Sequence, residues 1–317
     1  MTRIVACFFS VGIVVTGVGV AFAQDYPSKP VRIVTAPAGG ATDFMSRAIA
    51  PGLSASLGQS VLVDNRPQIF VTPLVAKSPS DGYTLLLGSG SHWVGPLLLK
   101  LTYDPVKDFA PVSTIARQPN VLVVHPSLPV KSVNELVVLA KARPGEINYT
   151  TSSVGSSSYL GSELFRSMTG VNMVRVAYSG GGPSLNALLG GEVQLLFTNP
   201  SSVSPHVKSG RLRALAVTSA EPSELVPGLP TMAASGLPGF ESVSTYVVFA
   251  PAKTPAAITN RLNREIVRVV NLPDVKERFL NSGVESVGST PEQLTATMTV
   301  EMAQVSKMLK EGTIKGE

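Results

Sequence analysis

Short apolar runs alternate with amphipathic segments along most of the chain. A β-branched run at residues 31–34 is followed by apolar residues at helical spacing through residue 57. The pattern repeats and predicts further strands at residues 61–63, 83–87, 110–116, 120–125, 147–150, 174–178, 193–197, 212–218 and 244–249. Helices are predicted to end near Leu57, Ala142, Met168, Leu189, Val270 and Asn281, and a last one to begin at Thr290. Strands that alternate with helices predict an α/β fold with mostly parallel sheets and helices on both faces.

The first strand ends in a glycine turn. Gly39 and Gly40 are followed by Thr42 and Asp43, two residue types that favour helix N-caps. A strand, a glycine turn and a helix N-terminus leave backbone N–H groups pointing into one small space, which suits an anion. The alternative is a tight turn with a capped helix and no ligand.

Polar loops follow several other predicted strands. They lie at residues 88–92, 151–158, 179–183 and 198–201 and are rich in Gly, Ser, Thr and Asn. In sheets of this kind, ligands bind outside the carboxyl ends of the strands. The loops therefore predict a small polar or anionic ligand, with His92 as a possible contact.

Residues 1–23 have the pattern of a secretory signal. Arg3 precedes an apolar run that closes with Ala21-Phe22-Ala23, a small-x-small cleavage pattern. The competing interpretation is a membrane anchor, because the run approaches spanning length. Cys7 is the only cysteine, so removal of the signal leaves no disulfide and no cysteine-ligated metal.

Charge and motifs exclude several classes of function. The net charge of +5 comes from scattered Lys and Arg residues with few aromatics, which predicts no nucleic-acid partner. No Gly-x-Ser-x-Gly, P-loop or dinucleotide fingerprint occurs, and the three histidines lack metal-ligand spacing. We expect no catalytic residue, no metal and no cofactor.

Several motifs together resemble one family. They are Gly39-Gly40-Ala41-Thr42-Asp43, Asp64-Asn65-Arg66-Pro67, Asp81-Gly82-Tyr83-Thr84-Leu85-Leu86, Tyr103-Asp104-Pro105-Val106-Lys107-Asp108-Phe109, Leu188-Leu189-Gly190-Gly191 and Leu212-Arg213-Ala214-Leu215-Ala216-Val217-Thr218. With these, essentially the whole chain after residue 23 resembles the Bug-type receptors of tripartite tricarboxylate transporters.

The resemblance implies a two-lobed periplasmic-binding-protein fold (type II-like) with a discontinuous first lobe. Lobe 1 would comprise residues 24–116 and 219–317, and lobe 2 residues 117–218. A monomer is expected to bind a small organic carboxylate between the lobes and to deliver it to membrane subunits. The implied ligand-binding residues are Gly40, Ala41, Thr42, Asp43, Ser89 and His92 on lobe 1, and Ser153, Gly155, Ser156, Ser157, Thr198 and Asn199 on lobe 2.

The chain departs from the family pattern after Pro67. A glycine-rich stretch is usual there, whereas this chain has Gln68-Ile69-Phe70. Ile69 and Phe70 either turn inward at the start of a helix or roof the site, which would favour a carboxylate with an apolar body. Three alternatives to a carboxylate receptor stay open: a receptor for a sulfonate- or phosphonate-like anion, a sensor subunit without a pocket, and a secreted serine hydrolase.

Overall fold

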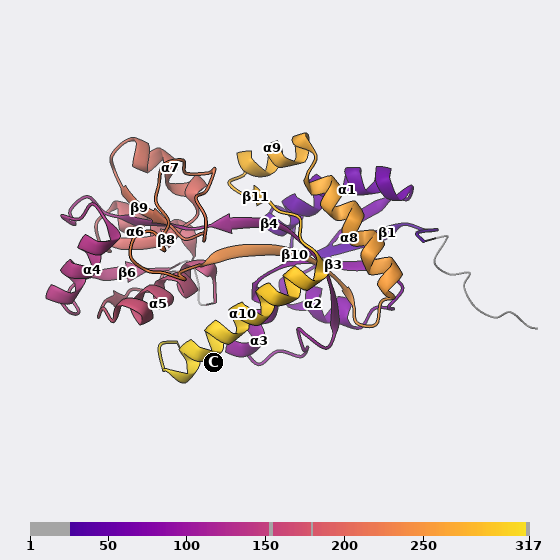
Figure 1. The fold of residues 1–317 in the computed structure, drawn as a ribbon, viewed down its shortest axis with the longest axis horizontal. Helices are drawn as coiled ribbons and strands as arrows, with labels where there is room; N and C mark the ends of the chain where they lie inside the picture. The colour runs from indigo at the N-terminus through magenta and orange to yellow at the C-terminus, as the bar shows by residue number, and fades with distance from the viewer. Residues whose placement is uncertain (1–25, 152–154, 179, 315–317) are drawn as a thin grey trace, which may run out of the picture.

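The computed structural model describes residues 26–151, 155–178 and 180–314 (Figure 1). The predicted signal, residues 1–23, lies outside the described residues. Two α/β lobes lie side by side, each built on its own sheet, and the long strands β4 and β10 run between them. The two-lobed α/β class predicted from the sequence is confirmed.

The first lobe has a six-stranded sheet in the order β11-β4-β10-β3-β1-β2. Its strands are β1 (Val31–Thr35), β2 (Val61–Asn65), β3 (Thr84–Ser89), β4 (Phe109–Pro119), β10 (Val243–Pro251) and β11 (Glu285–Ser286). Its helices are α1 (Ala41–Leu57), α2 (Gln68–Ala76), α3 (Ser91–Leu98), α8 (Ala256–Val270), α9 (Pro273–Asn281) and α10 (Pro291–Lys310). Successive strand residues point to opposite faces, so Ile33 packs with α1 and α8 and Val34 packs with α2.

The second lobe has a five-stranded sheet in the order β7-β6-β8-β5-β9. Its strands are β5 (Val121–Val124), β6 (Asn148–Thr150), β7 (Val174–Arg175), β8 (Leu195–Thr198) and β9 (Arg213–Val217). Its helices are α4 (Val133–Ala142), α5 (Ser157–Thr169), α6 (Gly181–Leu189) and α7 (Pro200–Lys208). The same alternation places Leu122 in the core under α4 and α5 and Val123 in the core under α6 and α7.

Both sheets are mixed, so the prediction of mostly parallel sheets is wrong. Strands β1, β2 and β3 pair in parallel, whereas β10 pairs antiparallel with both β3 and β4. The reason is the path between the lobes. The chain leaves the first lobe along β4 and returns along the neighbouring β10, so the two strands run in opposite directions.

The last helix packs on both lobes. Figure 1 shows α10 running across the front of the molecule, and it contacts β4 and α3 of the first lobe and α5 of the second. Its buried residues Met298, Val305 and Met308 belong to one hydrophobic cluster that also contains Trp93 and Phe165. The lobes are therefore joined by α10 as well as by the crossing strands, and the boundaries at 116 and 218 stay a prediction.

Candidate ligand-binding cleft

Four helices begin at the wall of one cleft between the lobes. The cleft has a volume of about 1680 Å³. Its lining includes N-cap or first-turn residues of all four helices: Thr42 of α1, Gly90 and Ser91 of α3, Ser156, Ser157 and Ser158 of α5, and Asn199 of α7. Each helix N-terminus carries partial positive charge and backbone N–H donors, so the cleft favours an anion.

The N-caps of the four helices differ between the lobes. On the second lobe, Ser156 accepts a hydrogen bond from the Tyr159 N–H, and Asn199 Oδ1 accepts one from the Ser202 N–H. On the first lobe the N-caps are Gly40 and Gly90, which have no side chain to accept a first-turn N–H. The first-lobe helices therefore leave more of their N-terminal donor capacity to a ligand.

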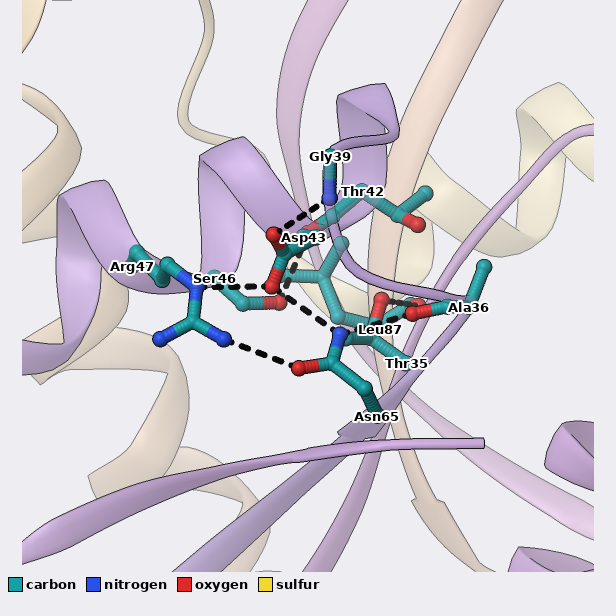
Figure 2. Close-up of polar contacts among 9 residues, drawn as sticks. All are labelled: Thr35, Ala36, Gly39, Thr42, Asp43, Ser46, Arg47, Asn65 and Leu87. Atoms are coloured by element: carbon teal, nitrogen blue, oxygen red, sulfur yellow. Dashed lines mark hydrogen bonds and ion pairs between the residues drawn. The ribbon is translucent and has the colours of Figure 1, made fainter. Parts of the chain in front are cut away.

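Asp43 braces the first loop instead of lining the cleft (Figure 2). Its Oδ2 accepts a hydrogen bond from the Gly39 N–H at 2.9 Å. Its Oδ1 accepts from Arg47 Nε at 2.8 Å and from Asn65 Nδ2 at 2.9 Å, and the same Asn65 amide donates to the Ala36 carbonyl. Burial raises the pKa of Asp43, but these hydrogen bonds outweigh it and hold the pKa below its usual range. The carboxylate is thus occupied by its own lobe.

His92 lies at the cleft, but its ring is packed in the core of the first lobe. The side chain is only 4% exposed. Its ring stacks on Tyr103 and packs edge-on against Phe109, with Phe249 also in contact. Burial lowers the pKa of His92 to about 4, so the ring is neutral at pH 7. The geometry does not support the predicted contact between this imidazole and a ligand.

The structure brings most of the predicted residues to one cleft, but not all of them. The cleft lining includes Thr42, Ser89, His92, Gly155, Ser156, Ser157, Thr198 and Asn199. Gly40, Ala41 and Asp43 do not line it, because α1 begins at this turn and only Thr42 of its first residues reaches the cleft. Ser153 lies outside the described residues.

The hydroxyl groups on the second-lobe side have structural partners. Ser157 Oγ accepts from Asn120 Nδ2 at 3.0 Å and lies 2.8 Å from Ser244 Oγ. Asn120 follows β4, and its backbone N–H donates to Thr218 Oγ1, which donates in turn to the Ser242 carbonyl. These contacts tie both interlobe crossings to the start of α5. Ser157 therefore couples the cleft to the segments that join the lobes.

Ile69 and Phe70 lie in the first turn of α2, as the first of the two alternatives predicts, but they stay exposed and do not turn inward. Ile69 is 74% exposed and Phe70 is 57% exposed. Ile69 lines the cleft, and Phe70 does not. The sequence pattern predicts neither α3 nor α7, two short helices that each contain an internal proline.

The cleft contains residues that the sequence pattern did not single out. They include Ala36, Arg117, Tyr246 and Glu301. Arg117 lies within the long strand β4 and Glu301 within α10, and neither is near a glycine-rich loop in the sequence. Among residues 26–151, 155–178 and 180–314, no group of three or more His, Cys, Asp and Glu side chains could hold a metal ion. In the same ranges no helix is long and apolar enough to span a bilayer.

Two α/β lobes around a cleft lined by helix N-termini define the fold of the two-lobed periplasmic binding proteins. Residues 45–314 match the sequence model of the tripartite tricarboxylate transporter family receptors, and the chain belongs to this family. The family consists of solute-binding receptors.

Individual relatives agree with this assignment. The chain is similar to Protein BugT of Bordetella pertussis, with 37% identity over 98% of each chain. The solved structure of R. palustris Rpa4515 with adipate is 37% identical, has a TM-score of 0.74 and covers 92% of this chain and 100% of its own. MatC (Rpa3494) from Rhodopseudomonas palustris with bound malate is 28% identical, has a TM-score of 0.68 and covers 90% and 100%.

Proposed function

We propose that this protein is a periplasmic receptor that binds a small organic carboxylate between its lobes. The observation that carries the proposal is the convergence of four helix N-termini on one interlobe cleft. The two similar structures that hold adipate and malate support a carboxylate as the ligand class. The bound carboxylate would then be delivered to membrane subunits of a tripartite transporter, as the family description implies.

Closure of the lobes on the ligand is part of the proposal. We infer that the hinge lies in the segments around Asn120 and Thr218, close to the predicted boundaries at residues 116–117 and 218–219. The hydrogen bonds that join the two crossings there support this position. Because α10 packs on both lobes, its contacts with α5 must slide or break as the cleft closes. Small-angle scattering with and without saturating ligand should show a smaller radius of gyration with ligand. An unchanged radius alongside demonstrated binding would rule out hinge closure.

The arrangement of the serine side chains disfavours the serine hydrolase alternative. Ser156 caps α5, and Ser157 contacts Asn120 and Ser244. A nucleophilic serine needs a neighbouring general base, and the one histidine of the cleft lining is neutral and packed among aromatic rings. A fluorophosphonate probe should therefore leave the protein unlabelled.

The direct test of the binding function is the identity of the solute that the protein retains. Native mass spectrometry of protein purified without refolding should detect a co-purified carboxylate. Thermal unfolding with adipate, malate, hexanoate and ethanesulfonate then compares the ligand classes, because a ligand at a hundredfold excess over Kd adds roughly 2.7 kcal/mol of stability. Stabilisation by ethanesulfonate alone would support the sulfonate alternative, and no stabilisation by any anion would support a sensor without a pocket.

A pair of serine substitutions, one in the cleft and one outside it, tests the position of the ligand site. Ser91 is exposed at the first turn of α3 and lines the cleft, so Ser91→Trp should abolish the shift with little cost to the fold. Ser209 is an exposed serine at the end of α7 and does not line the cleft, so Ser209→Trp should keep the shift. Equal ligand shifts in the two variants would place the site elsewhere.

Export is proposed together with the receptor function. Removal of residues 1–23 would leave Gln24 as the first residue. The intact mass of the protein recovered from the periplasmic fraction should match a chain that starts there. Recovery of the protein in the membrane fraction, with a mass that includes residues 1–23, would favour the membrane anchor.

A further inference from the structure

The described part of the cleft is lined by five charged side chains. They are Lys100, Arg117, Glu241, Glu301 and Lys307. Lys100 and Lys307 are exposed, and Lys307 lies 3.8 Å from Glu311. Arg117 differs from both lysines because it lies on β4, the strand that runs from one lobe to the other, and its side chain is 36% exposed. Its charge therefore lies at the junction of the lobes.

The Arg117 guanidinium has one ion-pair contact among the described residues. Its Nη1 lies 3.6 Å from Glu241 Oε1, a long distance for an ion pair. Its Nε is buried and makes no hydrogen bond within the described part of the chain. A guanidinium carries five N–H donors in a planar fork, and a carboxylate can accept two of them at once. The pair with Glu241 uses little of that capacity, and the Glu241 side chain is 43% exposed and able to move away.

A second carboxyl group lies on the same face of the sheet. Arg117 is directly opposite Thr245 of β10, so the two side chains share a face. Thr245 Oγ1 donates to Glu301 Oε1 at 3.5 Å, and Trp93 Nε1 donates to Glu301 Oε2 at 2.7 Å. Arg117 therefore lies between two acidic groups, one before β10 and one on α10, in the wall of the ligand cleft.

We propose that Arg117 binds a carboxylate of the ligand, and that Glu241 holds the guanidinium when no ligand is present. The inference rests on the proposed receptor function and deepens it by naming the ligand class. A ligand with one carboxylate at the helix N-termini has its second carboxylate matched by Arg117, which favours a dicarboxylate over a monocarboxylate. Because β4 joins the lobes, the second carboxylate would bind at the strand about which they move.

A proton should accompany this binding. Burial raises the pKa of Glu301 to about 7, although the hydrogen bond from Trp93 and the charge of Arg117 oppose the rise. The charged groups that act on Glu301 are Arg117 of β4 and Glu241 before β10, and α3 adds the neutral His92 beside Trp93. A carboxylate on Arg117 offsets the positive charge that Glu301 experiences, so its pKa rises further. Adipate binding near pH 7 should thus take up a fraction of a proton.

The experiment is calorimetric titration of adipate and hexanoate into wild type, Arg117→Gln, Arg117→Lys and the control Arg211→Gln. Arg211 is exposed and does not line the cleft. Loss of a charged hydrogen-bonding partner should weaken adipate binding by about tenfold to hundredfold in Arg117→Gln. Arg117→Lys keeps the charge and should lose less adipate affinity, and the adipate affinity of Arg211→Gln should stay within about twofold of wild type. The preference for adipate over hexanoate should shrink in Arg117→Gln. Thermal unfolding of each variant checks the fold.

The outcomes separate the inference from the function on which it rests. If wild type binds adipate and the affinity of Arg117→Gln is within about twofold of it, the role of Arg117 is overturned and the receptor function is unaffected. Failure of wild type to bind any carboxylate overturns both. Titrations in buffers of different ionisation enthalpy provide a second readout, since Glu301→Gln should bind adipate with no proton uptake. Uptake that persists in Glu301→Gln would contradict the assignment of the proton.

Discussion

The brace around Asp43 makes a stability prediction that tests the geometry of the first loop. In Asp43→Ala, the Gly39 N–H and one Asn65 Nδ2–H lose their acceptor beneath the loop. An unsatisfied buried donor costs about 1–3 kcal/mol. Asn65 is half-buried, but Gly39 is exposed, so water can replace part of the hydrogen bond that the Gly39 N–H loses. The Arg47 side chain is 55% exposed, so its ion pair adds less than about 1 kcal/mol. We expect the free energy of unfolding to fall by about 1–3 kcal/mol, mostly from the Asn65 amide.

Urea denaturation at pH 7 measures this change. Trp93 is the single tryptophan and is fully buried in the first lobe, so its fluorescence reports unfolding of the lobe that contains Asp43. Asp64→Ala is the matched control. Among the described residues, the Asp64 carboxylate forms ion pairs only with Arg66 at 2.8 Å and Arg32 at 3.4 Å. Removing this carboxylate should therefore lower the free energy of unfolding by less than about 1 kcal/mol. Equal losses in the two variants would refute the brace.

The pH dependence follows from the lowered pKa of Asp43. A carboxyl group with a folded pKa below its unfolded value adds stability above the unfolded pKa, and this stability is lost as the pH falls through the folded pKa. The difference between wild type and Asp43→Ala should therefore be largest near neutral pH and shrink below about pH 4. A difference that stays constant to pH 2 would show that the carboxylate charge plays no part.

Three further predictions concern other parts of the two lobes. His92→Phe should keep adipate affinity within about twofold of wild type, because the ring packs among aromatic side chains. The folded pKa of His92, about 4, is below its unfolded value, so the free energy of unfolding of wild type should decrease as the pH falls from about 6.5 to 4. The free energy of unfolding of His92→Phe should decrease less over this range. Equal decreases in the two proteins would contradict a buried, neutral His92. Ile69→Ser should reduce the affinity for hexanoate about fivefold more than the affinity for malate. Phe70 lies outside the cleft lining, so Phe70→Ser should reduce neither affinity. Equal effects of the two substitutions would refute the apolar roof. Glu163→Ala should lower the free energy of unfolding by about 2–4 kcal/mol without changing adipate affinity, because the buried carboxylate pairs with Arg166 at 2.7 Å; a loss under about 1 kcal/mol, measured by far-UV circular dichroism, would contradict this.

Local chemistry determined most of the elements of this fold. The helix Val133–Ala142 ends where the sequence predicts, and its start also has a local signal, because Ser132 caps it and Glu135 lies in its first turn. The terminal helix begins after Thr290, the residue at which the sequence predicts its start, and Thr290 forms a capping box with Gln293. The loops at residues 88–92 and 198–201 lie at the ends of β3 and β8 as predicted, since glycine, serine and asparagine terminate strands and cap helices. The strand predicted at residues 174–178 is shorter, because β7 ends at Arg175. Signals of this kind lie within a few neighbouring residues and can be read from the sequence alone.

Tertiary structure decided how those loops are used. Asp43 was expected at the ligand, but Asn65, 22 residues further along the chain, brings an amide to its carboxylate and fixes it as a brace. His92 follows a polar loop, yet Phe249 from the returning strand covers its ring. The sequence around Arg117 gives no sign of a binding residue. Its surroundings are formed by β10 and α10, which bring Thr245 and Glu301 to the same face of the sheet. Each outcome depends on packing between segments far apart in sequence, so no local pattern of residue types could have specified it.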